Sequence, residues 1–185
     1  MAHTARGGLG AAAGVAAVGF IAGMAATKVR KLAVQGMEAT QGDWFDVLKA
    51  EHRAVEKIFD QIFATKEDEK MKRTKLLLAL EQALGKHALQ EEDVVYPHLR
   101  MAGIEAETKE LASEHADIKT YLAELEELPK DDPHWIQRVK EFRKLIDHHV
   151  QEEETEIFPR YRDQLSPEES AKLTARMHME GLKLA

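Results

Sequence analysis

The chain has no cysteine, which excludes disulfides, thiolate metal ligands and iron–sulfur clusters. It has only five prolines, and aromatic residues make up 6% of its 185 residues. Charged residues make up 32%, and Ala, Leu, Glu and Lys dominate beyond the first segment. This composition disfavours a β-sheet protein and predicts an all-α fold, in a chain long enough to bury one hydrophobic core.

Positive charge is also scarce. The net charge is −7 at pH 7, which argues against nucleic acid as a partner, because a nucleic-acid binder needs a basic face. The charge is uneven, since residues 1–42 carry four Lys/Arg and one Glu, so that the remainder carries −10. We therefore expect a basic leading segment in a different environment from the acidic part.

Residues 7–26 form the one long run without a charge, and most of them are Gly or Ala. The run is just long enough to span a bilayer, and it contains Gly-x-x-x-Gly twice, the spacing that lets membrane helices approach closely. Three basic residues follow within residues 27–31, which would keep the folded domain in the cytoplasm, at the inner face of the membrane. We predict membrane association or self-association here. A cleaved signal peptide that directs export and a soluble or disordered tail are the alternatives.

The sequence pattern of the acidic part, residues 43–185, predicts five helices, at 43–65, 69–96, 105–128, 133–158 and 167–182. Asp43 and Asp132 are expected N-caps, and Ser166-Pro167-Glu168-Glu169 reads as a capping box with proline at the first helical position. We expect a Gly/Ala-rich segment and basic linker at 1–42, a four-helix bundle at 43–165, and a C-terminal helix at 166–185 that packs on the bundle or on a partner.

A metal-ligand pattern occurs twice. In each copy a Glu-His pair is followed 34 or 35 positions later by His-x-x-x-Glu, and then by an aromatic residue and a proline. The first copy consists of Glu51-His52, His87-x-x-x-Glu91 and Tyr96-Pro97, and the second of Glu114-His115, His149-x-x-x-Glu153 and Phe158-Pro159. Residues i and i+4 share one face of a helix, so each His-x-x-x-Glu can aim both side chains at one point.

Along each predicted helix, apolar residues recur every three or four positions, which is typical of the helix faces that form the core of a bundle. Six polar residues of the repeated pattern fall within these apolar stripes, or seams. They are His52, His87, Glu91, His115, His149 and Glu153. A buried carboxylate without a compensating charge is costly, and two metal ions would supply that charge. The alternative is a set of core histidines satisfied by neighbouring glutamates, but the doubled pattern favours metal. His52-x-x-x-Glu56 and His148-x-x-x-Glu152 also fit the motif, but they fall outside the repeated frame and are expected to be incidental.

These motifs resemble the hemerythrin-like "HHE cation-binding" domain over residues 43–162. The resemblance implies an up-down-up-down four-helix bundle with a non-haem di-iron centre, in which the four histidines are terminal ligands and Glu91 and Glu153 bridge the metals. It implies two iron ions (Fe²⁺/Fe³⁺), which could carry an oxo or hydroxo bridge; manganese and zinc are less favoured. The repeat suggests that His52 and His87 serve one metal, and His115 and His149 the other.

The chain departs from the oxygen-carrying members of this family. They have a second histidine one turn after the third-helix ligand, where this chain has Lys119, and a bridging Asp where it has Glu153. Open metal positions would then bind dioxygen, nitric oxide or peroxide, which favours sensing, stress protection or iron handling over oxygen carriage. We expect a binding protein rather than a dedicated enzyme, and we assign no catalytic residue. The alternatives are a di-iron enzyme that decomposes peroxide or reduces nitric oxide, and a membrane-associated scaffold with a structural metal.

Residues beside the six candidates admit two interpretations. Glu51, Glu92, Glu114 and Glu154 could orient the imidazoles, or they could lie on solvated helix faces, and the second is slightly favoured. Tyr96 could form a hydrogen bond near the site, whereas Phe158 is expected to pack at the end of the bundle.

Overall fold

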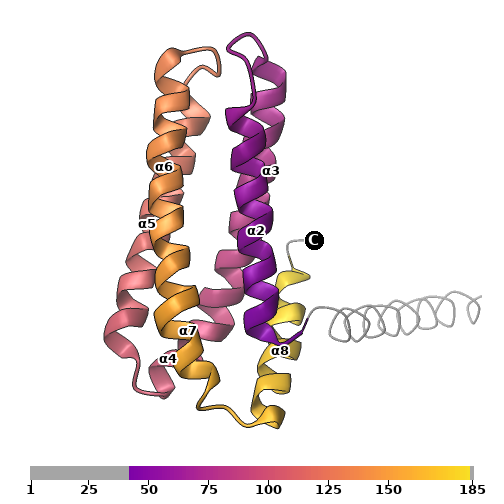
Figure 1. The fold of residues 1–185 in the computed structure, drawn as a ribbon, viewed down its shortest axis with the longest axis vertical. Coiled ribbons are helices and arrows are strands. Elements are labelled where there is room, and N and C mark those ends of the chain that lie inside the picture. The colour runs from indigo at the N-terminus through magenta and orange to yellow at the C-terminus, as the bar shows by residue number, and fades with distance from the viewer. Residues whose placement is uncertain (1–41, 184–185) are drawn as a thin grey trace, which may run out of the picture.

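The computed structural model describes residues 42–183, and all regular elements in that range are helices. The four long ones are α2 (Trp44–Phe63), α3 (Lys70–Gln90), α5 (Glu105–Glu127) and α6 (Pro133–Glu152). They run up, down, up and down side by side (Figure 1), which confirms the predicted fold class. The apolar run at 7–26 lies outside the described residues, so its membrane association stays a prediction. Between 42 and 183, no helix combines the length and apolarity needed to cross a bilayer.

Helix starts follow the local chemistry of the sequence. The Asp43 carboxylate accepts hydrogen bonds from the backbone N–H groups of Phe45 and Asp46 at the start of α2. Asp132 accepts from the N–H of His134 at the start of α6. Ser166 and Glu169 form the predicted capping box of α8 (Pro167–Gly181). These side chains satisfy backbone donors that have no partner within the helix.

The second and fourth long helices continue past the ends at 96 and 158 that the sequence predicts, which corrects those two boundaries. Each widens into a π-helical turn, η1 (Glu91–Val95) and η2 (Glu153–Ile157), and continues as α4 (Tyr96–Met101) and α7 (Phe158–Arg162). The N–H groups of Tyr96 and Phe158 bond to the carbonyls of Glu91 and Glu153, five residues back. A proline ring would crowd the carbonyl of residue i−4 in a regular α-helix, and the wider turn relieves that conflict.

The hydrophobic core forms two separate clusters along the bundle axis. One lies around Trp44, Tyr96 and Phe158, and the other around Phe59 and Phe142; none of these five side chains has exposed surface. The six polar candidates lie on the same seams, between the residues of these two clusters. A polar layer therefore divides the core.

Helix α8 packs along one side of the bundle, near the start of α2, where it contacts α2, α3 and η1 (Figure 1). The backbone N–H of Trp44 donates to Thr174 Oγ1 at 2.8 Å, and the Gln90 amide donates to the Met177 carbonyl at 3.3 Å. Leu173 and Met177 join the core cluster at that end. The helix thus extends the core of that half of the bundle on the side formed by α2 and α3.

Candidate metal centre

The six side chains singled out in the sequence converge on one buried point. Each long helix supplies one histidine, and each π-turn supplies one glutamate as its first residue. None of the six is more than 4% exposed, and Glu91 and Glu153 have no exposed surface. They form two overlapping groups of candidate metal ligands, one of His52, His87, Glu91 and Glu153, the other of Glu91, His115 and His149.

The imidazoles face one another in pairs. Nε2 of His52 lies 3.0 Å from Nε2 of His87, and Nε2 of His115 lies 3.3 Å from Nε2 of His149. These are the pairs that the repeat suggested. Two donors about 2.1 Å from one metal ion lie ~3.0 to ~3.4 Å apart at the usual coordination angles, so each pair has the spacing of ligands to one ion.

The two carboxylates lie between the imidazole pairs. Oε2 of Glu91 is 3.2 Å from Nε2 of His87 and 3.3 Å from Nε2 of His115. Glu153 reaches both pairs with different oxygens: Oε2 is 3.3 Å from Nε2 of His52, and Oε1 is 3.4 Å from Nε2 of His149. Each carboxylate therefore touches both pairs, as a bridging ligand would.

The four glutamates next to the cluster residues, here called the outer glutamates, are Glu51, Glu92, Glu114 and Glu154. They contact the imidazoles instead of only lying on solvated helix faces, which corrects our sequence-based preference. Each lies next to a cluster residue in sequence and accepts a hydrogen bond from the imidazole of a neighbouring helix. The contacts to Nδ1 are Glu51 to His87 (3.1 Å), Glu92 to His115 (2.9 Å), Glu114 to His149 (2.7 Å) and Glu154 to His52 (2.9 Å). Their matched positions in both copies were the signal that could have identified them.

These contacts fix the imidazole tautomers and show that the site fits a cation. An ionised carboxylate can only accept, so each Nδ1 must donate, and Nε2 then presents a lone pair towards the cluster. Lone pairs on facing Nε2 atoms repel unless a proton or a metal ion lies between them. Both oxygens of Glu91 and Oε2 of Glu153 also accept no hydrogen bond in the described structure, although imidazole nitrogens lie close to two of these oxygens. Buried lone pairs in this arrangement suit a metal ion.

Without metal, protons must supply the compensating charge. Burial alone would lower the pKa of His149, but the Glu153 charge and the Glu114 hydrogen bond outweigh it and raise the pKa to about 9. Burial opposes the charge of His87 as well, yet Glu91 and Glu51 hold its pKa well above the usual value. Burial would raise the pKa of Glu91, but the neighbouring imidazoles of His87 and His115 keep it well below its usual range.

The two copies differ at their aromatic residue. The buried hydroxyl of Tyr96 donates to Oε1 of Glu153 at 3.0 Å and lies 3.2 Å from Nε2 of His115, so it reaches the cluster as the sequence suggested. Burial, followed by the Glu153 charge, raises the pKa of Tyr96 well above its usual value, and the phenol keeps its proton. Phe158 packs instead against Trp44, with ring centroids 5.3 Å apart.

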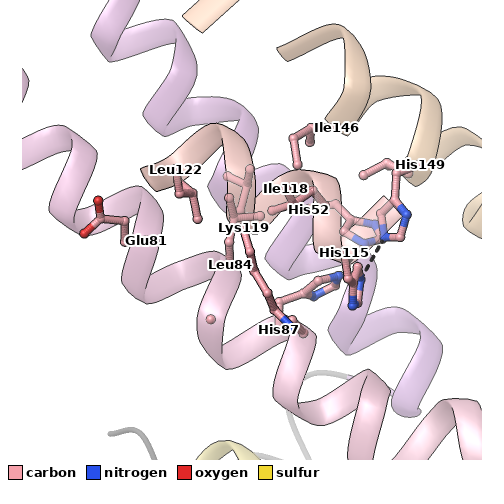
Figure 2. A pocket seen from close by; sticks show the side chains of 14 residues that line it. His52, Glu81, Leu84, His87, His115, Ile118, Lys119, Leu122, Ile146 and His149 are labelled. Atoms are coloured by element: carbon pink, nitrogen blue, oxygen red, sulfur yellow. Dashed lines mark hydrogen bonds between the residues drawn. The ribbon is translucent and has the colours of Figure 1, made fainter. Parts of the chain in front are cut away.

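A cavity of about 70 Å³ adjoins the imidazoles on the side away from α8. Figure 2 shows the four histidines at one end of it and Glu81 and Leu122 towards the other. Its wall is apolar apart from the imidazoles, Glu81 and Lys119, with Leu84, Ile118 and Ile146 among the lining residues. Gly85 also borders it, and a Cβ there would meet no atom within 4 Å.

Comparison with known proteins agrees with this geometry. A family model described as the hemerythrin HHE cation-binding domain matches residues 44–161. The chain also resembles the crystal structure of a hemerythrin HHE cation-binding domain-containing protein from Mycobacterium kansasii, with a TM-score of 0.69 and 22% identity, covering 77% of this chain and 87% of that one. At that identity the likeness shows the fold.

One curated relative has a different name. A protein from Nostoc sp. named DNA nickase is 26% identical over 136 residues, which is 74% of this chain. The chain spans only 38% of that protein's length. The similarity therefore covers a minority of that relative.

The outer glutamates generate a first prediction. Glu51→Ala should lower metal affinity by roughly 10- to 100-fold, because His87 loses the partner that fixes its ring and tautomer. Glu56→Ala is the matched control, since Glu56 lies in the same helix one turn after His52 but outside the cluster. Equilibrium dialysis against Zn²⁺ or Fe²⁺ measures the effect, and equal affinities for the two variants would contradict an orienting role.

The raised histidine pKa values predict how the metal-free protein responds to pH. His149 binds its proton more tightly when folded, with a pKa of about 9 against an ordinary value of 6.5. Its contribution to stability is complete below pH 6.5 and is lost as the pH rises through about 9. Urea unfolding of metal-free protein should therefore give a falling free energy of unfolding across that window. The zinc-loaded protein should show the opposite slope, because metal binds the deprotonated imidazole. A flat or rising profile without metal would contradict the assignment.

Proposed function

Because this chain belongs to the hemerythrin HHE cation-binding domain family, we propose that it holds two iron ions in the buried cluster and binds a small uncharged ligand, dioxygen or nitric oxide, through them. His52 and His87 would hold one ion, and His115 and His149 the other. Glu91 and Glu153 would bridge them. What supports this assignment is the pair of ligand groups that share Glu91 and meet at one buried point.

The donor chemistry supports iron among the candidate metals. The site offers four imidazole nitrogens and two carboxylates, and the chain has no thiolate. Imidazole with carboxylate suits iron, zinc and manganese, and the family resemblance adds the preference for iron. When bound, the iron would supply open coordination positions and redox chemistry.

The protein's own side chains prepare the site for a small ligand. The outer glutamates hold a proton on each Nδ1, so that all four Nε2 atoms stay available. Leu84, Ile118 and Ile146 line the approach and disfavour ordered water and ions. Tyr96 keeps a proton at its hydroxyl oxygen, directed at Glu153. An apolar cavity next to the imidazoles favours dioxygen or nitric oxide over peroxide, which is strongly hydrated.

The cavity also bears on the alternatives. A structural metal site is normally closed and needs no space beside its ligands, so the cavity disfavours the scaffold role. Peroxide decomposition would need a polar approach. We propose sensing, protection from nitrosative or oxidative stress, or iron handling as the roles that such ligand binding serves. We do not extend nickase activity to this chain, because the chain spans only 38% of that relative and has a net charge of −7.

The bridging role makes a mutational prediction. Glu91→Ala should abolish loading of both ions, because the two imidazole pairs lose one of the two carboxylates that they share. His98→Ala should not change loading, since His98 bonds to the Val94 carbonyl and to Arg176 rather than to the cluster. Metal analysis of purified, iron-supplied protein gives the answer. Two iron ions per chain in Glu91→Ala would refute the bridge.

The cavity makes a second prediction, at Gly85. Gly85→Phe should fill the approach and slow nitric-oxide association with the iron-loaded protein at least several-fold, with iron content unchanged. Gly85→Ala is the control: its methyl group has space, so association should be unaffected, and the exposed helix should gain about 1 kcal/mol of stability. Stopped-flow absorbance records the association. Equal rates in the two variants would show that ligands enter elsewhere.

A further inference from the structure

Three of the four outer glutamates have a second, cationic partner on the surface. Glu51 pairs with Lys86 at 2.6 Å, and Glu92 with Lys119 at 2.9 Å. Glu154 pairs with Arg53 at 3.0 Å. In each case the Lys or Arg offsets the negative charge of a glutamate that lies at the edge of the buried cluster.

The fourth glutamate breaks this pattern. No Lys or Arg of residues 42–183 pairs with Glu114; its Oε2 accepts from His149, and its Oε1 faces Nε2 of His148 at 3.7 Å. Glu152 faces the same Nε2, also at 3.7 Å. Two carboxylates, those of Glu114 and Glu152, therefore meet at one imidazole nitrogen. A cation is therefore missing where the other three glutamates have one.

The geometry of these three groups suits a metal ion. Their ligand atoms lie within 4.8 Å of one another. The separations of 3.7 Å are too long for hydrogen bonds, but they are close to the ~3.4 to ~3.6 Å between donors about 2.1 to 2.2 Å from a tetrahedral ion. The His148 side chain is 60% exposed, so an ion can reach it from solvent. The His148-x-x-x-Glu152 pair repeats the motif of the buried cluster one residue earlier in the chain.

We propose that Glu114, His148 and Glu152 form an outer site for a divalent cation such as Fe²⁺ or Zn²⁺, from which metal passes into the buried cluster. The site takes the place of the missing fixed cation. Glu114 links the outer site to the buried cluster, because its Oε1 faces His148 and its Oε2 accepts a hydrogen bond from His149. The passage inward rests on the proposed function of the buried cluster; the outer site itself does not.

Zinc titration of the metal-free full chain tests the outer site. Isothermal titration calorimetry should show one more equivalent of Zn²⁺ in the native chain than in His148→Ala, or should show that equivalent bound at least about tenfold more weakly in the variant. Glu152→Gln should weaken the same equivalent. His134→Ala is the control, because His134 is exposed and pairs with a single acid, Asp132. Equal zinc uptake by native chain and His148→Ala would overturn the site.

The loading rate tests the passage inward. After anaerobic addition of Fe²⁺, His148→Ala should fill the buried cluster several-fold more slowly and reach the same final content, whereas His134→Ala should match the native chain. An unchanged rate would overturn the feeding role. Failure of the proposed function gives a different result: the buried cluster would take up no iron in any of these proteins, while the zinc equivalent lost in His148→Ala would still be observed.

Discussion

The burial of two carboxylates, Glu91 and Glu153, in an otherwise apolar interior is the constraint on which the rest of the structure depends. Neither has exposed surface, and together they leave three oxygens without hydrogen bonds. Positive charge must therefore enter the core, either as protons on the imidazoles or as metal ions. These two states compete for the same Nε2 atoms, so metal uptake and proton release are one process.

The outer glutamates extend this constraint to the whole bundle. A residue beside a ligand in a helix points about a quarter-turn away, towards the adjacent helix, so the outer glutamate of one helix reaches the imidazole of another. The contacts close a ring: α2 to α3, η1 to α5, α5 to α6, and η2 back to α2. Because each imidazole is held by a different helix from its own, ligand orientation depends on correct packing of all four.

The bundle and the six converging side chains could be predicted from the sequence, because both depend on spacings of three and four that a helix converts directly into faces. The backbone beyond those side chains could not. Pro97 and Pro159 indicated that each helix would end or kink there, and the expected ranges ended at 96 and 158, whereas the chain inserts π-turns that start at Glu91 and Glu153 and then continues as helix. The repeat marked the outer glutamates but not their partners, since the contact of Glu92 with His115 depends on the rotation of two helices.

The sequence repeat conceals an asymmetry that matters for ligand chemistry. Around the first imidazole pair, the outer glutamates are both neutralised by fixed cations, Lys86 and Arg53. Around the second pair, Glu92 is paired with Lys119, but Glu114 faces His148 instead of a fixed cation, and Tyr96 places a hydroxyl beside His115. Two ions held in this cluster would thus have different neighbours. Both outer glutamates of the first pair have a fixed cation, whereas one of those around the second pair faces an exposed histidine, and a buried hydroxyl lies nearby. The second pair has the groups that can respond to solvent and to a ligand, so we expect the two metal positions to differ in reactivity although their ligands are nearly the same.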